Sequence, residues 1–236
     1  CLLSILAGGI INQFYDREKD QITRPFRTKI QSFLNQKYFL YAYLVLSIFS
    51  LGIAALISVR VFLFLLAYQF LIWLYSHKIS KVLVLNNFTF VTLTLYPFFG
   101  MLVYYKTFST PIFLMAVFLF IILFIIDILK DTLTKNADRI FGYHTLPNYF
   151  GMQVSTKILI ILQLCAFAIS MLLISRTHLD HLMSYYFAVG MFVIIFCLYK
   201  TFDTVRSSNF FILNIYRLWI FFGIVTMLLE GFFSKF

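Results

Sequence analysis

The acidic residues of this chain are few, and their positions are the best guide to its chemistry. Only nine of the 236 residues are Asp or Glu. Six of the nine lie in two short segments that follow apolar runs: Asp16, Glu18, Asp20, Asp127, Asp131 and Asp138. Acids that served only to make the protein soluble would be spread over all the connections, so this concentration indicates a site.

The spacing within each segment places the acids on one side of a helix. Asn12, Asp16 and Asp20 recur every four residues, so they would share one helical face with a drift of about 40° per step. Asp127 and Asp131 have the same spacing, and Asp138 follows two turns later. The sequence therefore predicts two acidic stripes.

Two such stripes need positive charge nearby. Like charges four residues apart on a helix repel each other, and carboxylates close to hydrocarbon are costly. Carboxylate and amide oxygens suit Mg²⁺, which also binds substrate phosphates, and no cluster of His and Cys favours zinc instead. The alternative is that the acids form ion pairs in the lipid headgroup layer with neighbouring bases: Arg17, Lys19, Lys130 and Arg139.

The residues beyond the first stripe suggest phosphate binding, and those beyond the second suggest a loop. Arg24 and Arg27 flank Pro25, and a guanidinium group matches phosphate oxygens with two hydrogen bonds. Contact with lipid headgroups is the alternative for these two arginines. After the second stripe, Gly142 is expected to end the helix and a Thr-Leu-Pro turn to start the next one. This tail is expected to shape a loop without a chemical role.

The composition indicates the solvent that surrounds these residues. The chain is 62% apolar, 20% aromatic and only 12% charged, whereas soluble domains are about 25% charged. Disordered, collagen-like and disulfide-scaffold proteins are excluded as well, and three cysteines in apolar runs predict neither a zinc site nor a disulfide framework. The net charge of +10 comes from bases in short gaps between apolar runs, which is typical of membrane topology and not of nucleic-acid binding.

Seven apolar runs are long enough to cross a bilayer as helices, because a hydrocarbon core of about 30 Å needs about 20 helical residues. They lie near residues 38–58, 60–77, 84–104, 109–130, 154–175, 182–200 and 210–233. Runs such as 112–126 have no polar member, whereas the strands of a membrane barrel alternate. The sequence therefore predicts an all-α protein, a polytopic transmembrane helical bundle.

The basic residues predict the orientation of this bundle. The connection after the apolar residues 1–11 and the connections after the second, fourth and sixth of these runs hold 14 Lys and Arg, and the alternate connections hold three. By the positive-inside rule, the basic connections and both acidic stripes are expected on the cytoplasmic side. The uncharged residues 1–11 would cover about 16 Å as a helix. We expect them to be the second half of a span in an N-terminally truncated chain, which gives about eight visible segments.

The two stripes resemble the aspartate-rich motifs of a known family. The run 12–27, NQFYDREKDQITRPFR, resembles the first motif, NxxxDxxxD followed by RPxR, of the UbiA superfamily of intramembrane prenyltransferases. The run 127–147, with its three Asp and its final Thr-Leu-Pro, resembles the second motif. Weaker similarities to a loop and to the last helix of the family involve Tyr75, Ser76, Asn87, Arg217 and Gly223.

The resemblance implies a nine-helix fold with both motifs on the cytoplasmic side. It implies that residues 1–236 form one transmembrane prenyltransferase-like domain, which lacks the first helix and part of the second. It also implies Mg²⁺ ions that bridge a prenyl diphosphate. The metal ligands would be Asn12, Asp16, Asp20, Asp127, Asp131 and Asp138, with Asp16, Asp20 and Asp131 as catalytic residues. The residues expected to contact the diphosphate are Arg24, Arg27, Lys81 and Lys130, and those expected to contact the rest of the substrate are Tyr75 and Asn87.

Three departures from the family pattern predict a metal affinity or substrate range unlike that of typical members. Gln13 stands where the family often has Asp, and Thr134 replaces a middle acid of the second motif. The family's loop lysine lies four or five residues after the Tyr. Here Lys78 and Lys81 lie three and six residues after Tyr75, so neither is in register.

The expected function is Mg²⁺-dependent transfer of a polyprenyl group from a prenyl diphosphate to a lipophilic acceptor, either a glycerol phosphate or an aromatic compound. One alternative is a terpene cyclase of the same superfamily, which ionises the diphosphate without a separate acceptor. Another is a transporter or a non-catalytic membrane protein, which the lack of repeats disfavours. The expected partners are the two substrates and the lipid of a bacterial inner membrane, with no nucleic acid. The oligomeric state is left open.

Overall fold

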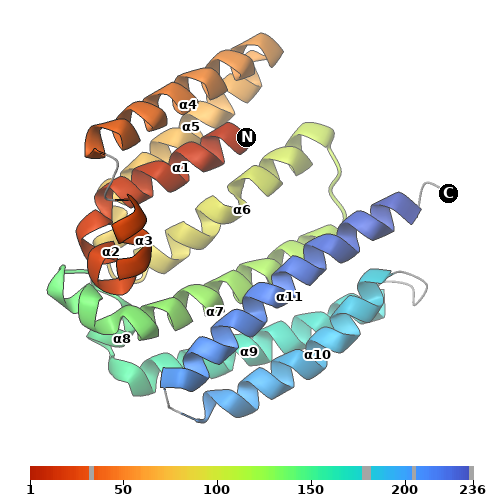
Figure 1. Ribbon diagram of the computed structural model, residues 1–236. Helices are drawn as coiled ribbons and strands as arrows, with labels where there is room; N and C mark the ends of the chain where they lie inside the picture. The colour runs from red at the N-terminus through yellow and green to blue at the C-terminus, as the bar shows by residue number, and fades with distance from the viewer. Residues whose placement is uncertain (32–34, 177–181, 204–205, 234–236) are drawn as a thin grey trace. The chain divides into compact units, whose positions relative to one another are not determined.

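The computed structural model is helical in nearly all the residues that it describes, which are 1–31, 35–176, 182–203 and 206–233. In chain order the helices are α1 Leu2–Tyr15, α2 Arg17–Thr23, α3 Pro25–Gln31, α4 Gln36–Ile57, α5 Val59–His77, the short 3-10 helix η1 Ile79–Lys81, α6 Leu85–Tyr105, α7 Thr110–Ile140, α8 Leu146–Tyr149, α9 Gly151–Arg176, α10 Leu182–Thr201 and α11 Arg206–Phe233 (Figure 1). The prediction of an all-α protein is confirmed.

Seven helices are long and apolar enough to cross a membrane: α4, α5, α6, α7, α9, α10 and the Ser208–Phe232 part of α11. They match the predicted runs in number and order. The largest difference is in α7, which continues past the predicted end at residue 130 to Ile140 and therefore carries the whole second acidic stripe. The remaining apolar helix, α1, is too short to belong to this group. It is the eighth apolar segment.

Contacts divide the described chain into two compact units. The first unit comprises Cys1–Tyr105 and Asn136–Thr145, and the second comprises Lys106–Lys135 and Leu146–Phe236. The division passes through α7, so the acids of the second stripe belong to both units. It does not test the expectation of a single domain over residues 1–236, which stays a prediction.

In the first unit, α1 packs against α4 and α5, and α5 also packs against α6 (Figure 1). Ser58 alone separates α4 from α5. Its backbone is extended, and its Oγ accepts a hydrogen bond from Val61 N at 3.2 Å, which caps the new helix. Buried apolar residues from four helices, among them Ile11, Leu65 and Ile72, form the core that fixes α1 beside α5.

Polar side chains add specific contacts within this apolar packing. Ser4 Oγ on α1 lies 2.6 Å from Ser50 Oγ on α4, and Gln69 Nε2 on α5 donates to Ser4 Oγ at 3.3 Å. Such hydrogen bonds join helices in lipid, where the apolar surroundings give no preference for one partner over another. These hydrogen bonds fix the position of α1 along the axes of α4 and α5, and therefore the position of the first motif at the end of α1.

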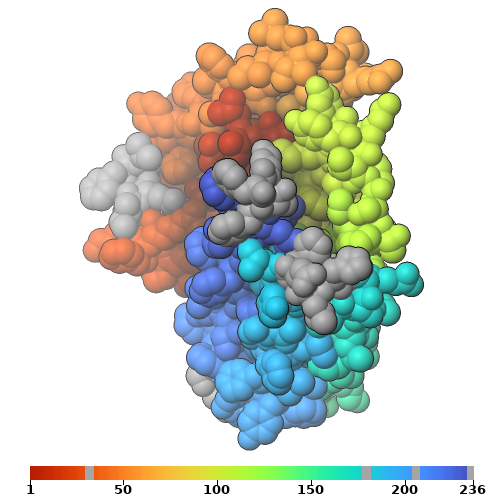
Figure 2. Space-filling view, turned by 90° about the vertical axis from the view of Figure 1, so that its right-hand side faces the viewer, coloured from red at the N-terminus to blue at the C-terminus, as the bar shows by residue number. Residues whose placement is uncertain are grey.

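In the second unit, α10 packs against both α9 and α11, and α8 packs against α9. Figure 2 shows α10 and α11 side by side as the light and dark blue atoms of one face. Phe187 on α10 meets Phe118 on α7 edge to face, with ring centroids 5.3 Å apart. Gln163 Nε2 on α9 donates to Thr201 Oγ1 on α10 at 3.0 Å, which is again a hydrogen bond between apolar helices.

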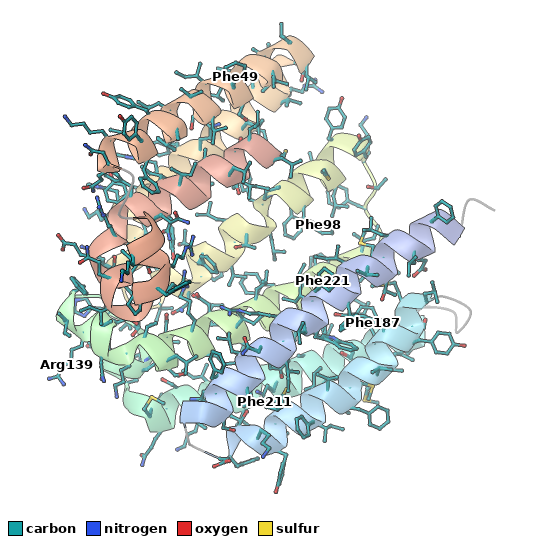
Figure 3. All side chains as sticks on the ribbon, in the orientation of Figure 1. Phe49, Phe98, Arg139, Phe187, Phe211 and Phe221 are labelled. Atoms are coloured by element: carbon teal, nitrogen blue, oxygen red, sulfur yellow. The ribbon has the colours of Figure 1, made fainter. Side chains whose placement is uncertain are left out.

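Large apolar side chains cover the outer surfaces of the spanning helices. Phe49 on α4 and Phe211 and Phe221 on α11 are each at least half exposed (Figure 3). Aromatic and aliphatic side chains at this density would be unfavourable in water, whereas hydrocarbon accommodates them at no cost. Together with the seven spans, they define an integral, multi-pass membrane protein.

Candidate functional site

The first acidic motif lies where the chain leaves α1. Asp16 separates α1 from α2, and Arg24 separates α2 from α3, which begins at Pro25. The backbone nevertheless keeps helical spacing across Asp16, because Asp16 N donates to Asn12 O at 2.9 Å and Asp20 N donates to Asp16 O at 2.8 Å. Asn12, Asp16 and Asp20 therefore lie one turn apart, as their spacing predicts.

The end of α7 directs the second motif toward the first within the same unit. Gly142 has a φ of +71°, in the left-handed region that favours glycine. Tyr143 N donates to Asp138 O at 2.8 Å, and Gly142 N donates to Arg139 O at 3.5 Å. This pair of bonds is a Schellman motif, which turns the chain back against the helix end. Tyr143 is thereby placed beside Asp138.

The Tyr143 hydroxyl joins the two motifs. It donates a hydrogen bond of 2.6 Å to Asp16 Oδ1. The other carboxylate oxygen of Asp16 accepts from Asn12 Nδ2 at 3.0 Å, and Asn12 Oδ1 in turn accepts from the Ser76 hydroxyl of α5 at 3.5 Å. A chain of polar contacts thus runs from α5 through α1 to the loop after α7.

Two lysines flank the ring of Tyr143. Lys19 Nζ lies 4.0 Å from the ring centroid and forms an ion pair of 2.5 Å with Asp138 Oδ1. Lys81 Nζ lies 5.4 Å from the same ring, and the carbonyl oxygen of Lys81 accepts from His144 N at 3.2 Å. Positive charge is attracted to the face of an aromatic ring, so the site gathers two cations and two carboxylates around one phenol.

The loop between α5 and α6 supplies the other predicted residues of this unit. The Tyr75 hydroxyl donates to Asn86 Oδ1 at 2.9 Å, and Asn87 is fully buried. Val84 has a φ of +65°, a strained conformation for a β-branched residue, at the point where the chain turns from η1 into α6. This turn holds Lys81 on one side and the two asparagines on the other.

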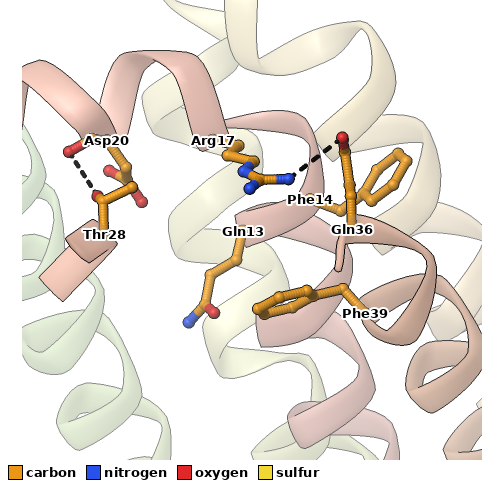
Figure 4. Close-up of a pocket in the computed structure, with 7 residues that line it drawn as sticks. All are labelled: Gln13, Phe14, Arg17, Asp20, Thr28, Gln36 and Phe39. Carbon is orange, nitrogen blue, oxygen red and sulfur yellow. Dashed lines mark hydrogen bonds between the residues drawn. The ribbon is translucent and has the colours of Figure 1, made fainter. Parts of the chain in front are cut away.

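Asp20 lies on a pocket of its own in the first unit. The pocket is lined by Gln13, Phe14, Arg17, Asp20, Thr28, Gln36 and Phe39 (Figure 4). The Thr28 hydroxyl donates to Asp20 O at 3.0 Å, and Arg17 donates to Gln36 Oε1 at 3.4 Å (Figure 4). The predicted phosphate ligands Arg24 and Arg27 are exposed at the surface.

The remaining predicted residues belong to the second unit. Asp127 and Asp131 are both almost fully buried on α7, and Lys130 Nζ lies 2.8 Å from Asp127 Oδ1. Thr134, which replaces an acid of the family pattern, donates its hydroxyl to the carbonyl of Lys130 at 3.1 Å. Asp131 and Asp138 follow Asp127 by four and by eleven residues on one continuous helix. At about 100° per residue, the three acids therefore share a helical face to within about 40°.

Tyr143 is the residue that sequence reasoning missed. The tail after the second stripe was expected only to shape a loop. Its Tyr143 nevertheless donates from its hydroxyl to Asp16 of the first motif and from its backbone N to the carbonyl oxygen of Asp138 in the second. Burial raises the pKa of the Tyr143 phenol above its ordinary value of 10, and the nearby Asp16 carboxylate raises it further. The hydroxyl therefore stays protonated and can donate throughout the physiological range. Gly142 was the available signal, because a Schellman motif brings the next side chain back to the helix end.

The ion pairs bear directly on whether these residues fit a divalent cation. Lys19 pairs with Asp138, and Lys130 pairs with Asp127. Ion pairs of the acids with neighbouring bases are what the alternative to a metal site predicts. Among the residues that the structure describes, no three His, Cys, Asp or Glu side chains stand close enough together to hold a metal ion. The donor atoms themselves are carboxylate and amide oxygens, which suit Mg²⁺. An ammonium already bound at Asp138 shows that positive charge is accommodated there.

Comparison with known proteins identifies the family of this chain. The model of the UbiA prenyltransferase family matches residues 1–227, so the chain belongs to that family. Digeranylgeranylglyceryl phosphate synthase of Thermococcus sibiricus is 30% identical over 166 residues, which are 70% of this chain and 59% of that protein. The enzyme of the same name from Methanosphaera stadtmanae is 27% identical over 168 residues, 71% of this chain and 61% of that protein. The aligned part thus spans about three fifths of these relatives.

Solved structures share the fold. A UbiA homologue from Aeropyrum pernix without ligand has a TM-score of 0.71 at 17% identity, covering 95% of this chain and 86% of that one. A UbiA homologue from Archaeoglobus fulgidus, bound to GPP and Mg²⁺, has a TM-score of 0.64 at 16% identity with the same coverage. At such low identity these likenesses establish the fold, and the prediction of a UbiA-like helical bundle is confirmed.

Proposed function

We propose that this protein transfers a polyprenyl group from a prenyl diphosphate to the hydroxyl of a glycerol-phosphate lipid, in a Mg²⁺-dependent reaction in the membrane. The observation that carries the proposal is the meeting of the two motifs, where Asp16 and Asp138 are joined through Tyr143 and Lys19. Membership of the UbiA family supports the reaction type. Relatives named digeranylgeranylglyceryl phosphate synthase support the acceptor class.

The proposed cofactor is Mg²⁺, which the Archaeoglobus homologue binds together with GPP. The proposed ligands are Asn12, Asp16, Asp20, Asp127, Asp131 and Asp138. When bound, the metal would stabilise the negative charge that develops on the diphosphate as the allylic C–O bond breaks. Asp16, Asp20 and Asp131 are proposed as the acids on which activity depends most.

The basic residues are proposed to hold the diphosphate itself. Arg24 and Arg27 are exposed immediately after the first motif, where guanidinium groups can reach phosphate oxygens. Lys81 lies beside Tyr143, and Lys130 lies on α7 between two acids. Charges placed before the reaction starts need no reorganisation as the leaving group becomes anionic.

Tyr75 and Asn87 are proposed to contact the rest of the substrate. The hydrogen bond from Tyr75 to Asn86 fixes the phenol ring, and a fixed ring can exclude water and face an allylic cation. The apolar surfaces of the spans are suited to the prenyl tail. Because most aromatic residues serve in packing or lipid contact, only Tyr75 is assigned this role.

The site is proposed to face the cytoplasm. The excess of basic residues in the connections on the motif side supports this orientation. A bacterial inner membrane stays a prediction, and the relatives compared above are archaeal.

The test of the proposed function is product analysis with the full-length protein. Purified protein is incubated with Mg²⁺, labelled geranylgeranyl diphosphate and either a glycerol-phosphate lipid or a phenolic acceptor, with an Asp16→Asn variant as control. We expect a labelled adduct of the glycerol-phosphate lipid that the variant does not form. An adduct of the phenol alone would contradict the acceptor class, and a cyclised hydrocarbon or alcohol without acceptor would show a terpene cyclase instead.

A further inference from the structure

We propose that the Lys19 ammonium and a divalent cation compete for the Asp138 carboxylate, so that Lys19 takes the place of the metal when no metal is bound. The proposal rests on the proposed function, because it assumes that Asp138 is a metal ligand. It gives Lys19 a role beyond that of an ion-pair partner of the acids. The role is positioning and charge balance rather than catalysis.

The ion pair lies in surroundings that make it energetically important. Lys19 Nζ is 2.5 Å from Asp138 Oδ1, and the side chains of Lys19 and Asp138 are 13% and 0% exposed. A carboxylate that is removed from water requires a positive partner, because an uncompensated buried charge is strongly destabilising. Lys19 provides that partner without a metal ion.

Tyr143 extends this charge balance to the first motif. Its ring lies under the Lys19 ammonium at 4.0 Å, and its hydroxyl donates to Asp16 at 2.6 Å. Lysine and tyrosine thus satisfy one carboxylate from each motif, and they come from α2 and from the loop after α7. A metal that takes the Asp138 oxygen now held by Lys19 displaces the ammonium from it.

Lysine is suited to such displacement. Its ammonium is a compact charge on a flexible four-carbon stem, so it can leave one carboxylate without movement of the backbone. Lys19 is also partly accessible, whereas Asp138 is not. The ammonium can therefore move toward solvent or toward another anion when a divalent cation takes its position.

The first test measures metal binding without substrate. Mn²⁺ affinity is measured by electron paramagnetic resonance on purified wild-type protein, on Lys19→Gln and on the matched control Lys37→Gln, whose side chain is exposed at the start of α4. We expect Lys19→Gln to bind Mn²⁺ at least about tenfold more tightly, because the ion no longer displaces an ammonium. We expect the Lys37→Gln variant to match the wild type. Equal or weaker binding by Lys19→Gln would overturn the proposal.

A second measurement needs no mutation and covers the case in which Lys19→Gln fails to fold. Wild-type protein is treated with an amine-acetylating reagent, and Lys19 modification is quantified by mass spectrometry with and without saturating Mn²⁺. We expect Mn²⁺ to increase Lys19 acetylation several-fold and to leave Lys37 unchanged. Unchanged Lys19 acetylation at saturating Mn²⁺ would contradict displacement. If prenyl transfer is intact at the same time, only this inference fails and the proposed function stands.

Discussion

At the scale of single residues, the site depends on how a few polar side chains are shared between the two motifs. Asp16 accepts hydrogen bonds from Asn12 and Tyr143, and Lys19 pairs with Asp138. The acids and Asn12 were predictable, because their spacing follows the helical repeat. Tyr143 and Lys19 were not assigned to the site, since their contacts depend on how the end of α7 turns.

Replacing Tyr143 by Phe tests the contact between the motifs. The substitution removes the hydroxyl that donates to Asp16 at 2.6 Å and leaves the ring in place beside Lys19. We expect the free energy of unfolding to fall by about 1–2 kcal/mol, because a hydrogen bond to a charged group is lost. Thermal unfolding in detergent measures the change, and Tyr149→Phe, an exposed tyrosine of α8, is the matched control.

The raised pKa of Tyr143 gives a dependence of stability on pH. Burial and the Asp16 carboxylate raise this pKa above 10 in the folded protein. Below pH 10, the ordinary pKa of tyrosine, the phenol is protonated in both the folded and the unfolded chain, and its contribution to the stability of the fold is complete. Above pH 10 the unfolded chain releases the proton and the folded protein keeps it, so this contribution is lost as the pH rises. We expect the wild type to lose stability relative to Tyr143→Phe between about pH 10 and about pH 11. A constant difference between the two proteins over this range would contradict the assigned cause.

At the scale of elements, the helices bring residues distant in sequence to one place. The second stripe lies on the end of a helix that is longer than its apolar run predicts, because α7 continues to Ile140. Hydropathy marks where a helix enters lipid and does not mark where the helix itself ends. The position of Gly142 marks that end, and the Thr-Leu-Pro turn leads into α8 as expected.

Gly100 tests the packing of α5 against α6. A Cβ at this position would overlap the ring of Phe64, which stacks on Tyr96 with centroids 4.5 Å apart. We expect Gly100→Ala to destabilise the protein by about 1–3 kcal/mol, because the aromatic stack must shift. The control is Gly52→Ala on α4, where the added Cβ meets open space. There we expect no loss, and a gain of up to about 1 kcal/mol from helix propensity. Thermal unfolding in detergent compares both variants with the wild type, and equal stability of Gly100→Ala and wild type would contradict this packing.

At the scale of the whole molecule, composition and charge were sufficient to predict the membrane class and the number of spans. The seven apolar runs correspond to seven helices in the part of the chain that the structure describes. Which helices pack against each other could not be predicted, because apolar residues occur on nearly all sides of each spanning helix. They depend on specific contacts such as Ser4 with Ser50 and Gln163 with Thr201.

The charge asymmetry predicts which connections share a side of the membrane. We expect Lys37→Cys and Lys78→Cys to react with an impermeant thiol reagent from the same side, and Arg60→Cys from the opposite side, because α4 and α5 separate these positions. The variants are made in a chain without its three native cysteines. Labelling of all three positions from one side would contradict the topology.

The central claim is that carboxylates of both motifs act at one metal-dependent diphosphate site. Its most direct test is Mg²⁺-dependent release of diphosphate from labelled geranylgeranyl diphosphate by full-length wild-type protein, by Asp16→Asn and by Asp138→Asn. We predict a loss of at least about a hundredfold in each variant, since each removes a charge that holds the cofactor, while membrane insertion and thermal unfolding remain measurable. Full Mg²⁺-dependent activity in either folded variant would contradict the claim.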